Sequence, residues 1–119
     1  MKWGICLWKI MHDISFEYPL FPSPSEKKSH EFFYTNLKNV IPCLICRKHY
    51  VKLLKNFSIK NYLTNKYSLI FWVFTAHNIV NKRLKKKIYN IKNLVLKYFP
   101  NYDDIDLVSN FILQLKKFI

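Results

Sequence analysis

Two cysteines separated by two residues, Cys43 and Cys46, are the clearest chemical signal in this chain. Where such a pair opens a helix, the first turn brings the two sulfurs close enough to form a reversible disulfide. The helix N-terminus also stabilises a thiolate on one of the two. Arg47, Lys48 and His49 place further positive charge beside the pair. Taken alone, the motif fits two kinds of site, a redox dithiol and one half of a metal site.

The other cysteines and histidines do not complete a metal site of regular spacing. The chain contains three cysteines and four histidines. A structural zinc site usually needs two such cysteine pairs, or one pair followed by histidines at short spacing. His49 follows Cys46 closely, but no fourth ligand follows in a regular pattern, so a redox pair is favoured and no metal is predicted. Three cysteines are also too few for the disulfide framework of a small secreted scaffold.

The third cysteine, Cys6, has two possible roles. It fits a small apolar side chain buried in an apolar helix, and it also fits an additional thiol that shuttles electrons or bridges two subunits. We favour the buried position, because the residues around Cys6 form an apolar helical segment.

A second group of polar side chains lies beside large aromatic residues. Trp8 and His12 are four residues apart, and so are His77 and Asn81, so each pair shares one face of a helix. An ordinary core would hold aliphatic residues at such positions, because an unpaired buried amide costs about 1–3 kcal/mol. A polar and planar ligand such as a nucleotide cofactor would satisfy these groups. Each residue taken singly also fits ordinary packing, and only their joint occurrence favours a cofactor.

Length and composition predict one folded domain over residues 1–119. The chain is long enough to bury a core without disulfides. Hydrophobic residues make up 50% of it and aromatic residues 18%, which excludes a disordered chain. The longest apolar runs, such as residues 68–76, are too short to span a bilayer, and the N-terminus lacks the pattern of a signal peptide. We therefore expect a soluble protein with no membrane span.

The net charge of +13 is carried mainly by lysine. It has two explanations: a codon bias in an AT-rich genome, and an attraction to polyanions such as nucleic acid, a membrane surface or a phosphate-bearing cofactor. Net charge alone does not decide between them, and we expect no dedicated nucleic-acid role. The alternative function is a basic helical module that binds nucleic acid or a protein, with cysteines that are incidental or bind zinc.

The elements that position these residues are predicted to be helices. Apolar residues recur at helical spacing along nearly the whole chain, and the single glycine argues against a turn-rich β architecture. Longer helices are predicted over about residues 3–15, 24–41, 43–54 and 66–85, and shorter ones over about residues 90–98 and 103–117. The fold class is therefore predicted to be all-α, with the helices packed as a bundle.

Several predicted helix ends carry local signals. A capping box, Ser23 to Glu26, starts the second helix with a proline at its first position, and a proline directly before the cysteine pair ends it. Asp103 and Asp104 suit the start of the last helix through its dipole. The apolar positions of the second helix are Phe32, Phe33, Leu37, Val40 and Ile41. In the last helix, Phe111, Ile112 and Leu115 are predicted to serve packing or a dimer surface.

The order of the motifs resembles that of the Erv/ALR family of FAD-dependent sulfhydryl oxidases. The three motifs are Trp-Gly-x-x-x-Trp-x-x-x-His from Trp3, Pro-Cys-x-x-Cys from Pro42, and Trp-x-x-x-x-His-Asn-x-Val-Asn-x-x-Leu from Trp72. The resemblance covers residues 3–89, and the short chain is similar to the single-domain forms encoded by large DNA viruses. It implies a four-helix bundle with short additional C-terminal helices and with FAD at the mouth of the bundle.

The resemblance also implies an activity, the oxidation of thiols to disulfides. Cys46 would be the sulfur next to the flavin, and Cys43 would exchange with the thiols of a client protein or a small thiol carrier. The electrons would pass to FAD and then to oxygen, giving hydrogen peroxide. For His49, a second interpretation is that it only caps or solvates the helix of the cysteines. The implied FAD contacts are Trp3, Gly4, Trp8, His12, His49, Trp72, His77, Asn78, Asn81, Lys82, Lys86 and Tyr89.

The resemblance has further implications and some departures. Relatives commonly form homodimers through their first two helices, and the viral forms act in the host cytoplasm or the virion. The family often has Leu-Gly-Lys-Pro after the asparagine motif, where this chain has Leu84 followed by three lysines. Those lysines fit either a solvated surface or a phosphate contact. The chain has no second cysteine pair, so the electrons would reach Cys43 directly from a partner.

Overall fold

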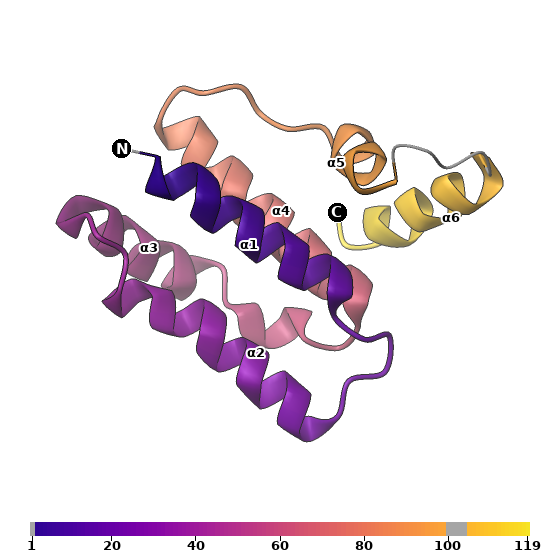
Figure 1. Ribbon diagram of the computed structural model, residues 1–119, viewed down its shortest axis with the longest axis horizontal. Coiled ribbons are helices and arrows are strands. Elements are labelled where there is room, and N and C mark those ends of the chain that lie inside the picture. Colours follow the sequence, from indigo (N-terminus) through magenta and orange to yellow (C-terminus); the bar gives the residue numbers. More distant parts are fainter. Residues whose placement is uncertain (1, 100–104) are drawn as a thin grey trace.

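All regular elements of the described part of the chain are helices, which confirms the predicted all-α class. The computed structural model describes residues 2–99 and 105–119, with the side chains of the last helix described from residue 108 onward. The elements, shown in Figure 1, are α1 (Trp3–Glu17), α2 (Pro24–Asn36), the 3-10 turn η1 (Leu37–Asn39), α3 (Leu44–Asn56), the 3-10 turn η2 (Ile59–Tyr62), α4 (Lys66–Arg83), α5 (Ile91–Tyr98) and α6 (Ile105–Lys116).

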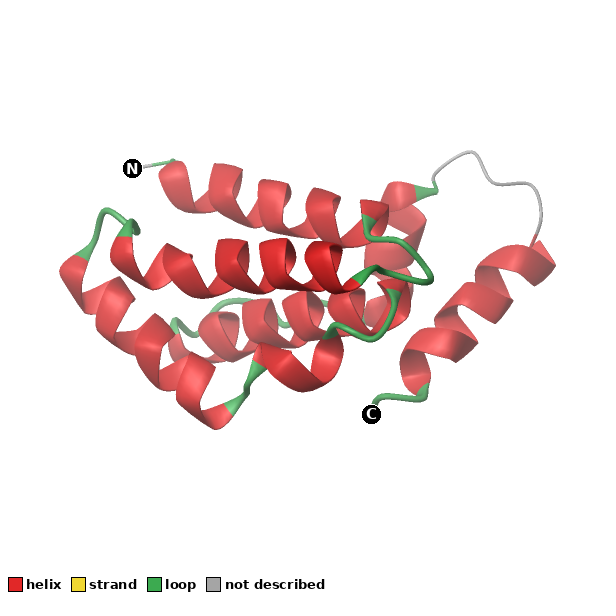
Figure 2. Ribbon diagram, turned by 90° about the horizontal axis from the view of Figure 1, so that it is seen from below, coloured by secondary structure: helices red, strands yellow, loops and turns green. Residues whose placement is uncertain are grey.

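The four longer helices form the predicted bundle, and the two short ones lie beside it. α1 packs along α4, while η1 and η2 fill the turns that join α2, α3 and α4. Figures 1 and 2 show α5 and α6 together at one side of the bundle. The first turns of α1 and α3 and the last turn of α4 lie at the same end (Figure 1), which is the mouth of the bundle. No helix among the described residues is both long and apolar enough to cross a bilayer.

The core of the bundle is built around Trp72 of α4. Its side chain is fully buried, its ring stacks on Phe57 at an interplanar angle of 6°, and its Nε1–H donates to the Phe57 carbonyl at 3.1 Å. The buried Tyr34 hydroxyl donates to the Met11 carbonyl at 2.7 Å and so joins α2 to α1. Aromatic residues with such polar ends supply a large apolar area and a fixed hydrogen bond at once.

A second cluster attaches the C-terminal helices to the bundle. Phe16 of α1, Phe71 of α4 and Leu94 of α5 pack there with the fully buried Leu115 of α6. The residues for which packing or a dimer surface was predicted therefore serve packing, since Phe111 and Ile112 lie against the same cluster as Leu115. The predicted start of the last helix at Asp103 and Asp104 lies outside the described residues.

The second helix begins as predicted but ends earlier. The Ser23 hydroxyl accepts from the Glu26 N–H at 3.1 Å, and the Glu26 carboxylate accepts from the Ser23 N–H at 2.9 Å. α2 ends at Asn36 and tightens into η1, because the chain must turn back to start α3. The Arg47 Nε–H donates to the Ile41 carbonyl and fixes this turn. Of the predicted apolar positions, Leu37 and Ile41 are buried and Phe33 is partly buried, whereas Phe32 and Val40 are 67% and 58% exposed.

The end of α4 is a Schellman motif with a lysine in the left-handed position. α4 ends at Arg83, two residues before the predicted end, and Lys85 has a φ of 58°. The Lys86 N–H donates to the Asn81 carbonyl at 2.8 Å, and the Lys85 N–H donates to the Lys82 carbonyl at 3.2 Å, as this motif requires. Position 85 is where the resembling family has glycine. A left-handed residue with a Cβ costs roughly 1–2 kcal/mol.

Candidate functional site

A large cavity at the mouth of the bundle brings most of the predicted site residues together. Its volume is about 1460 Å³, which exceeds the roughly 300–1,000 Å³ of most small-molecule sites. It is bounded by α1, the start of α3, the end of α4, the segment after α4, and α5. The predicted site residues that line it are Trp3, Gly4, Trp8, His12, Cys43, Cys46, His49, His77, Asn81, Lys86 and Tyr89.

The cysteine pair lies at the rim of this cavity, where α3 begins. Cys43 is the N-cap residue of α3, and its sulfur accepts from the Cys46 N–H at 3.3 Å. The Cys46 thiol also donates a hydrogen bond to Cys43, and both bonds lower the pKa of Cys43. The same thiol bond raises the pKa of Cys46, because it stabilises the protonated form of that residue. In the reduced pair, Cys43 therefore loses its proton more readily than Cys46.

Two histidines form the inner wall of the cavity. The His12 Nε2 and the His77 Nδ1 are hydrogen-bonded at 2.9 Å, and the Trp8 ring stacks on His77 with centroids 4.1 Å apart. Burial lowers the pKa of His12 to about 3, and the repulsion that a protonated His77 would exert lowers it further. Burial also lowers the pKa of His77 to about 4, helped by the charge of Lys97. Both rings are therefore neutral near pH 7, and one donates the bond to the other.

One nitrogen of this pair has no partner. The His12 Nδ1 is buried and makes no hydrogen bond to any described residue. A buried polar atom left without a partner costs about 1–3 kcal/mol. A ligand that fills the cavity and supplies a hydrogen-bonding group would remove this cost, so the wall around His12 fits a polar cofactor.

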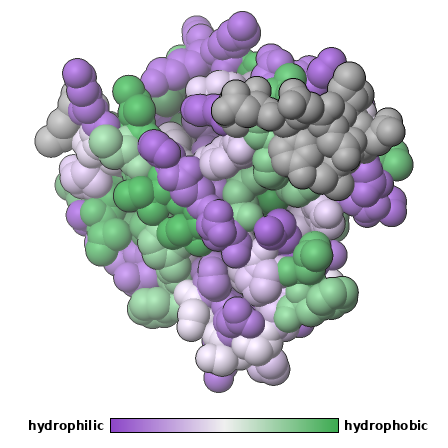
Figure 3. All heavy atoms as spheres, turned by 45° about the vertical axis from the view of Figure 1, so that its right-hand side comes forward, coloured by the Kyte–Doolittle hydropathy of each residue, from purple (hydrophilic) through white to green (hydrophobic). Residues whose placement is uncertain are grey.

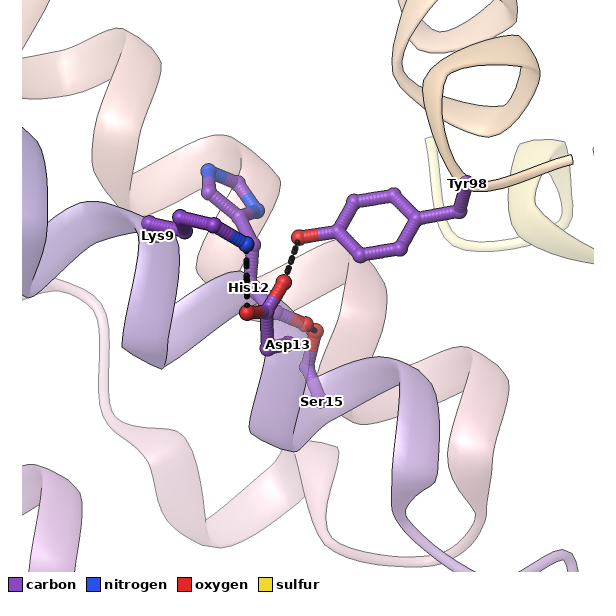
Figure 4. A network of polar contacts seen from close by, with 5 residues as sticks. All are labelled: Lys9, His12, Asp13, Ser15 and Tyr98. Carbon is purple, nitrogen blue, oxygen red and sulfur yellow. Dashed lines mark hydrogen bonds and ion pairs between the residues drawn. The ribbon is translucent and has the colours of Figure 1, made fainter. Parts of the chain in front are cut away.

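A polar network attaches α5 to α1 at the edge of the cavity (Figure 4). Asp13 accepts from the Lys9 ammonium at 2.8 Å and from the Tyr98 hydroxyl at 2.7 Å. These bonds lower the pKa of Asp13, with that from Lys9 the largest cause. The Tyr98 ring also stacks on Phe16 with centroids 3.8 Å apart. Sequence analysis missed Asp13 and Tyr98. Spacing alone predicts the pairing of Lys9 with Asp13, but nothing local indicates a partner 85 residues away.

Three of the predicted cofactor contacts do not line the cavity. Trp72 lies in the core and Lys82 is exposed on α4. Asn78 binds the backbone of Tyr89 in both directions, donating to its carbonyl at 3.1 Å and accepting from its N–H at 2.8 Å. Asn78 thus fixes the segment that places the Tyr89 ring 4.9 Å from His77. For these three residues a direct cofactor contact stays a prediction.

The favoured position for Cys6 was wrong, because Cys6 is exposed. The buried stripe of α1 runs through Met11, His12 and Ser15, and the helical period places Cys6 outside it. Among residues 2–99 and 105–119, no three His, Cys, Asp or Glu side chains gather so that they could hold a metal ion. The described residues therefore give no support to the zinc-binding alternative.

The fold is that of the Erv1 flavoprotein core. The crystal structure of the FAD binding domain of Erv1 from Saccharomyces cerevisiae matches with a TM-score of 0.75 at 24% identity, covering 84% of this chain and 93% of that one. The yeast Erv1 core matches with a TM-score of 0.76 at 24% identity, covering 84% of this chain and 83% of that one.

Sequence comparison then gives the family. The model of the Erv1 / Alr family matches residues 5–100, so the chain belongs to this family. An FAD-linked sulfhydryl oxidase of African swine fever virus is 34% identical over 74% of this chain and 72% of its own length. A probable FAD-linked sulfhydryl oxidase of Acanthamoeba polyphaga mimivirus is 30% identical over 73% of this chain. The chain spans 62% of the mimiviral relative and 52% of the yeast relative ERV2.

Proposed function

We propose that this chain is an FAD-linked thiol oxidase that forms disulfides in client thiols. The observation that carries the proposal is that the dithiol and the cofactor-sized cavity share one space. Cys43 and Cys46 line the same cavity as Trp8, His12 and His77. Membership of the Erv1 / Alr family supports the same chemistry, since relatives from viruses and yeast are named FAD-linked sulfhydryl oxidases.

The cavity residues fit FAD in chemistry as well as in volume. Aromatic rings from Trp8 and Tyr89 offer surfaces to planar rings, and the unpartnered His12 Nδ1 offers a hydrogen bond. Cations that suit a pyrophosphate also line the cavity, among them Lys86 and Lys97. When bound, FAD would take two electrons from the reduced cysteine pair and pass them to oxygen, giving hydrogen peroxide.

The cysteines themselves would perform thiol–disulfide exchange. A client thiolate attacks the sulfur of Cys43 in the oxidised pair, which breaks the Cys43–Cys46 bond and leaves a thiolate on Cys46. A second client thiolate then attacks the client sulfur of this mixed disulfide and releases Cys43. The client leaves with a new disulfide, and the pair now holds two electrons. The hydrogen bonds that lower the pKa of Cys43 make it a good leaving group in the second step.

The absorbance spectrum of the purified chain tests the proposal most directly. A yellow protein with a flavin spectrum, which consumes oxygen and releases peroxide when dithiothreitol is added, is expected. A colourless protein that FAD does not reconstitute would overturn the proposal. Nucleic-acid binding by such a colourless protein, weakening steeply with salt, would point instead to the basic helical module.

We further propose that the enzyme is a homodimer. Ile5 and Ile10 of α1 and Phe32 of α2 are exposed, and hydrophobic side chains stay visible between hydrophilic ones at the surface (Figure 3). Light scattering should give twice the 14.5 kDa of one chain, and a mass equal to one chain would contradict the proposal.

Since several relatives come from large DNA viruses, we propose the host cytoplasm or the virion as the place of action.

A further inference from the structure

The net positive charge of this protein comes from one part of the chain. Residues 32–99 contain 14 of the 20 Lys and Arg residues and none of the seven Asp and Glu residues. This range includes α3, α4 and α5, so these three helices carry no carboxylate side chain. A general bias toward lysine would not remove carboxylates from one segment and leave them elsewhere. We therefore look for the cause of this separation of basic from acidic residues in the function of the site that α3, α4 and α5 help to form.

Only some of these cations belong to the proposed cofactor site. Arg83, Lys86 and Lys97 line the main cavity, where they suit a phosphate group. Lys52 and Lys55 of α3 are exposed and do not line that cavity. Their charge thus faces solvent toward the C-terminal end of α3, the helix that begins at the cysteine pair, and is available to a second ligand.

A groove between α3 and α4 runs on from the main cavity. Its volume is about 460 Å³, and His49, Val80 and Arg83 line both spaces. We call it the α3–α4 groove and define it by the residues of its floor and rim. The floor is apolar and consists of Leu53, Phe57, Ile79 and Val80, while His49, Lys52, Asn56 and Arg83 form a polar rim.

We propose that the α3–α4 groove is the docking site for the client of the proposed oxidase, a protein segment that carries acidic and apolar side chains beside its cysteine. An apolar side chain would occupy the floor, and carboxylates would pair with Lys52 and Arg83 at the rim. The residues between the two cysteines, Leu44 and Ile45, are 70% and 65% exposed and extend the apolar surface around Cys43. The proposal rests on the function proposed above and adds the chemical class of the client.

The groove suits a peptide better than nucleic acid or a small thiol. Proteins that bind single-stranded nucleic acid stack its bases on exposed aromatic rings. The exposed large apolar residues of the described parts of α3 and α4 are aliphatic, and the Phe57 ring of the groove floor is already stacked on Trp72. A small neutral thiol would leave both floor and rim of the groove without contacts, so a protein segment is the better occupant.

Binding without turnover tests the docking site independently of the oxidase activity. The probes are two fluorescent peptides of equal length, one with aspartates and one with lysines around an apolar residue, and with serine in place of each cysteine. The test variant is Lys52→Glu with Lys55→Glu on α3. The matched control is Lys27→Glu with Lys28→Glu on the exposed start of α2, which changes the net charge equally.

Fluorescence anisotropy should show that the wild-type protein binds the acidic peptide about tenfold more tightly than the lysine peptide. The α3 variant should lose this preference and the α2 control should keep it. At 1 M salt, where the Debye length is about 3 Å, the preference should shrink. If both variants bound the acidic peptide equally weakly, net charge alone would explain the preference, and the proposal would be overturned. So would a single-stranded oligonucleotide that binds more tightly than the acidic peptide.

Turnover adds a second readout. With the reduced dithiol form of the acidic peptide, the α3 variant should lose most of its kcat/KM, while its kcat/KM for dithiothreitol stays that of the wild type. Equal losses with both substrates would mean that the substitutions damage the redox site, and would contradict a docking role. If the wild-type protein oxidises neither substrate, the proposed function is wrong. The binding experiment then still tests whether the α3–α4 groove binds the acidic peptide.

Discussion

Around Trp72 and around His12 the bundle buries polar side chains in opposite ways. In the core, the tyrosine hydroxyls of Tyr18, Tyr34 and Tyr50 each donate to a backbone carbonyl at 2.6–2.8 Å. At the cavity, the His12 Nδ1 is the one buried side-chain polar atom of the described residues without a partner. The core is complete without any ligand, whereas the cavity wall is not.

This difference separates what holds the fold from what performs the chemistry. Hydrogen bonds from buried side chains to backbone carbonyls fix distant helices to each other, and each is worth about 1 kcal/mol net. The cavity end holds instead two thiols, two histidines that are neutral near pH 7 and, in the turn after α4, a left-handed lysine. Substitutions in the two regions should therefore change different measured quantities.

The largest effect should come from the cysteine pair. Cys43→Ser and Cys46→Ser should each reduce thiol oxidation to the background rate, because a single sulfur cannot form the internal disulfide. Cys43→Ser should still retain FAD, since the cavity walls are unchanged. Oxygen consumption with dithiothreitol measures the activity, and thermal unfolding checks that the fold is intact. Wild-type turnover by either variant would exclude the pair from the reaction.

The next largest effect, on stability, should come from Trp72→Phe in the core. The substitution removes the Nε1–H donor and leaves the Phe57 carbonyl without it, which should lower the free energy of unfolding by about 1–3 kcal/mol. Urea denaturation of the apoprotein measures this loss. FAD content at saturating cofactor should be unchanged if Trp72 acts only through the core. A normal stability with lost FAD would instead support the predicted cofactor contact.

Acid should weaken the cavity end before it affects the core. The pKa values of His12 and His77 are lowered to about 3 and about 4 in the folded protein, against about 6.5 in the unfolded chain. Above pH 6.5 both states hold these rings neutral, and stability is full. As pH falls below 6.5 the unfolded chain takes up protons that the folded protein does not, so stability declines, by up to about 1.4 kcal/mol per pH unit for His12.

Urea denaturation of the apoprotein between pH 7 and pH 5 measures this slope. His12→Gln should flatten it, because glutamine does not titrate. His30 of α2 serves as the control, since it does not line the cavity: its ring bonds the Glu26 carbonyl and packs edge-on against Tyr18. His30→Gln should therefore leave the slope unchanged. If both variants flattened the slope equally, the pH dependence of stability would not come from the buried pair of His12 and His77.

Features set within one helical turn could be predicted from sequence. The capping box at Ser23, the helix start at Cys43 and the Trp8–His12 face depend only on neighbours a few residues away. The end of α2 could not be predicted, because Arg47 helps to set it by binding the Ile41 carbonyl from the next helix. Contacts across the bundle could not be predicted either, because they join residues that are far apart in the sequence.

In the candidate site, too, local features could be predicted and contacts between distant residues could not. Resemblance of motifs identified cavity residues such as Trp8, His12 and His77, since their spacing within each motif is a local property. It did not indicate that Asn78 holds the backbone of Tyr89, or that Tyr98 meets Asp13. It also suggested a buried Cys6, because an apolar neighbourhood in sequence does not say which face of a helix the bundle covers.

The smallest expected effect has the opposite sign and lies at the left-handed lysine. Lys85→Gly should raise the free energy of unfolding by about 1 kcal/mol, because glycine adopts a φ of 58° without the clash of a Cβ. Lys87→Gly is the matched control, since it removes the same charge from the same segment at a residue whose φ is not positive. Urea denaturation of the two apoproteins measures the difference. A gain shared by both variants would assign the effect to charge repulsion among the three lysines, and a gain confined to Lys85→Gly would assign it to the strained turn at the cavity.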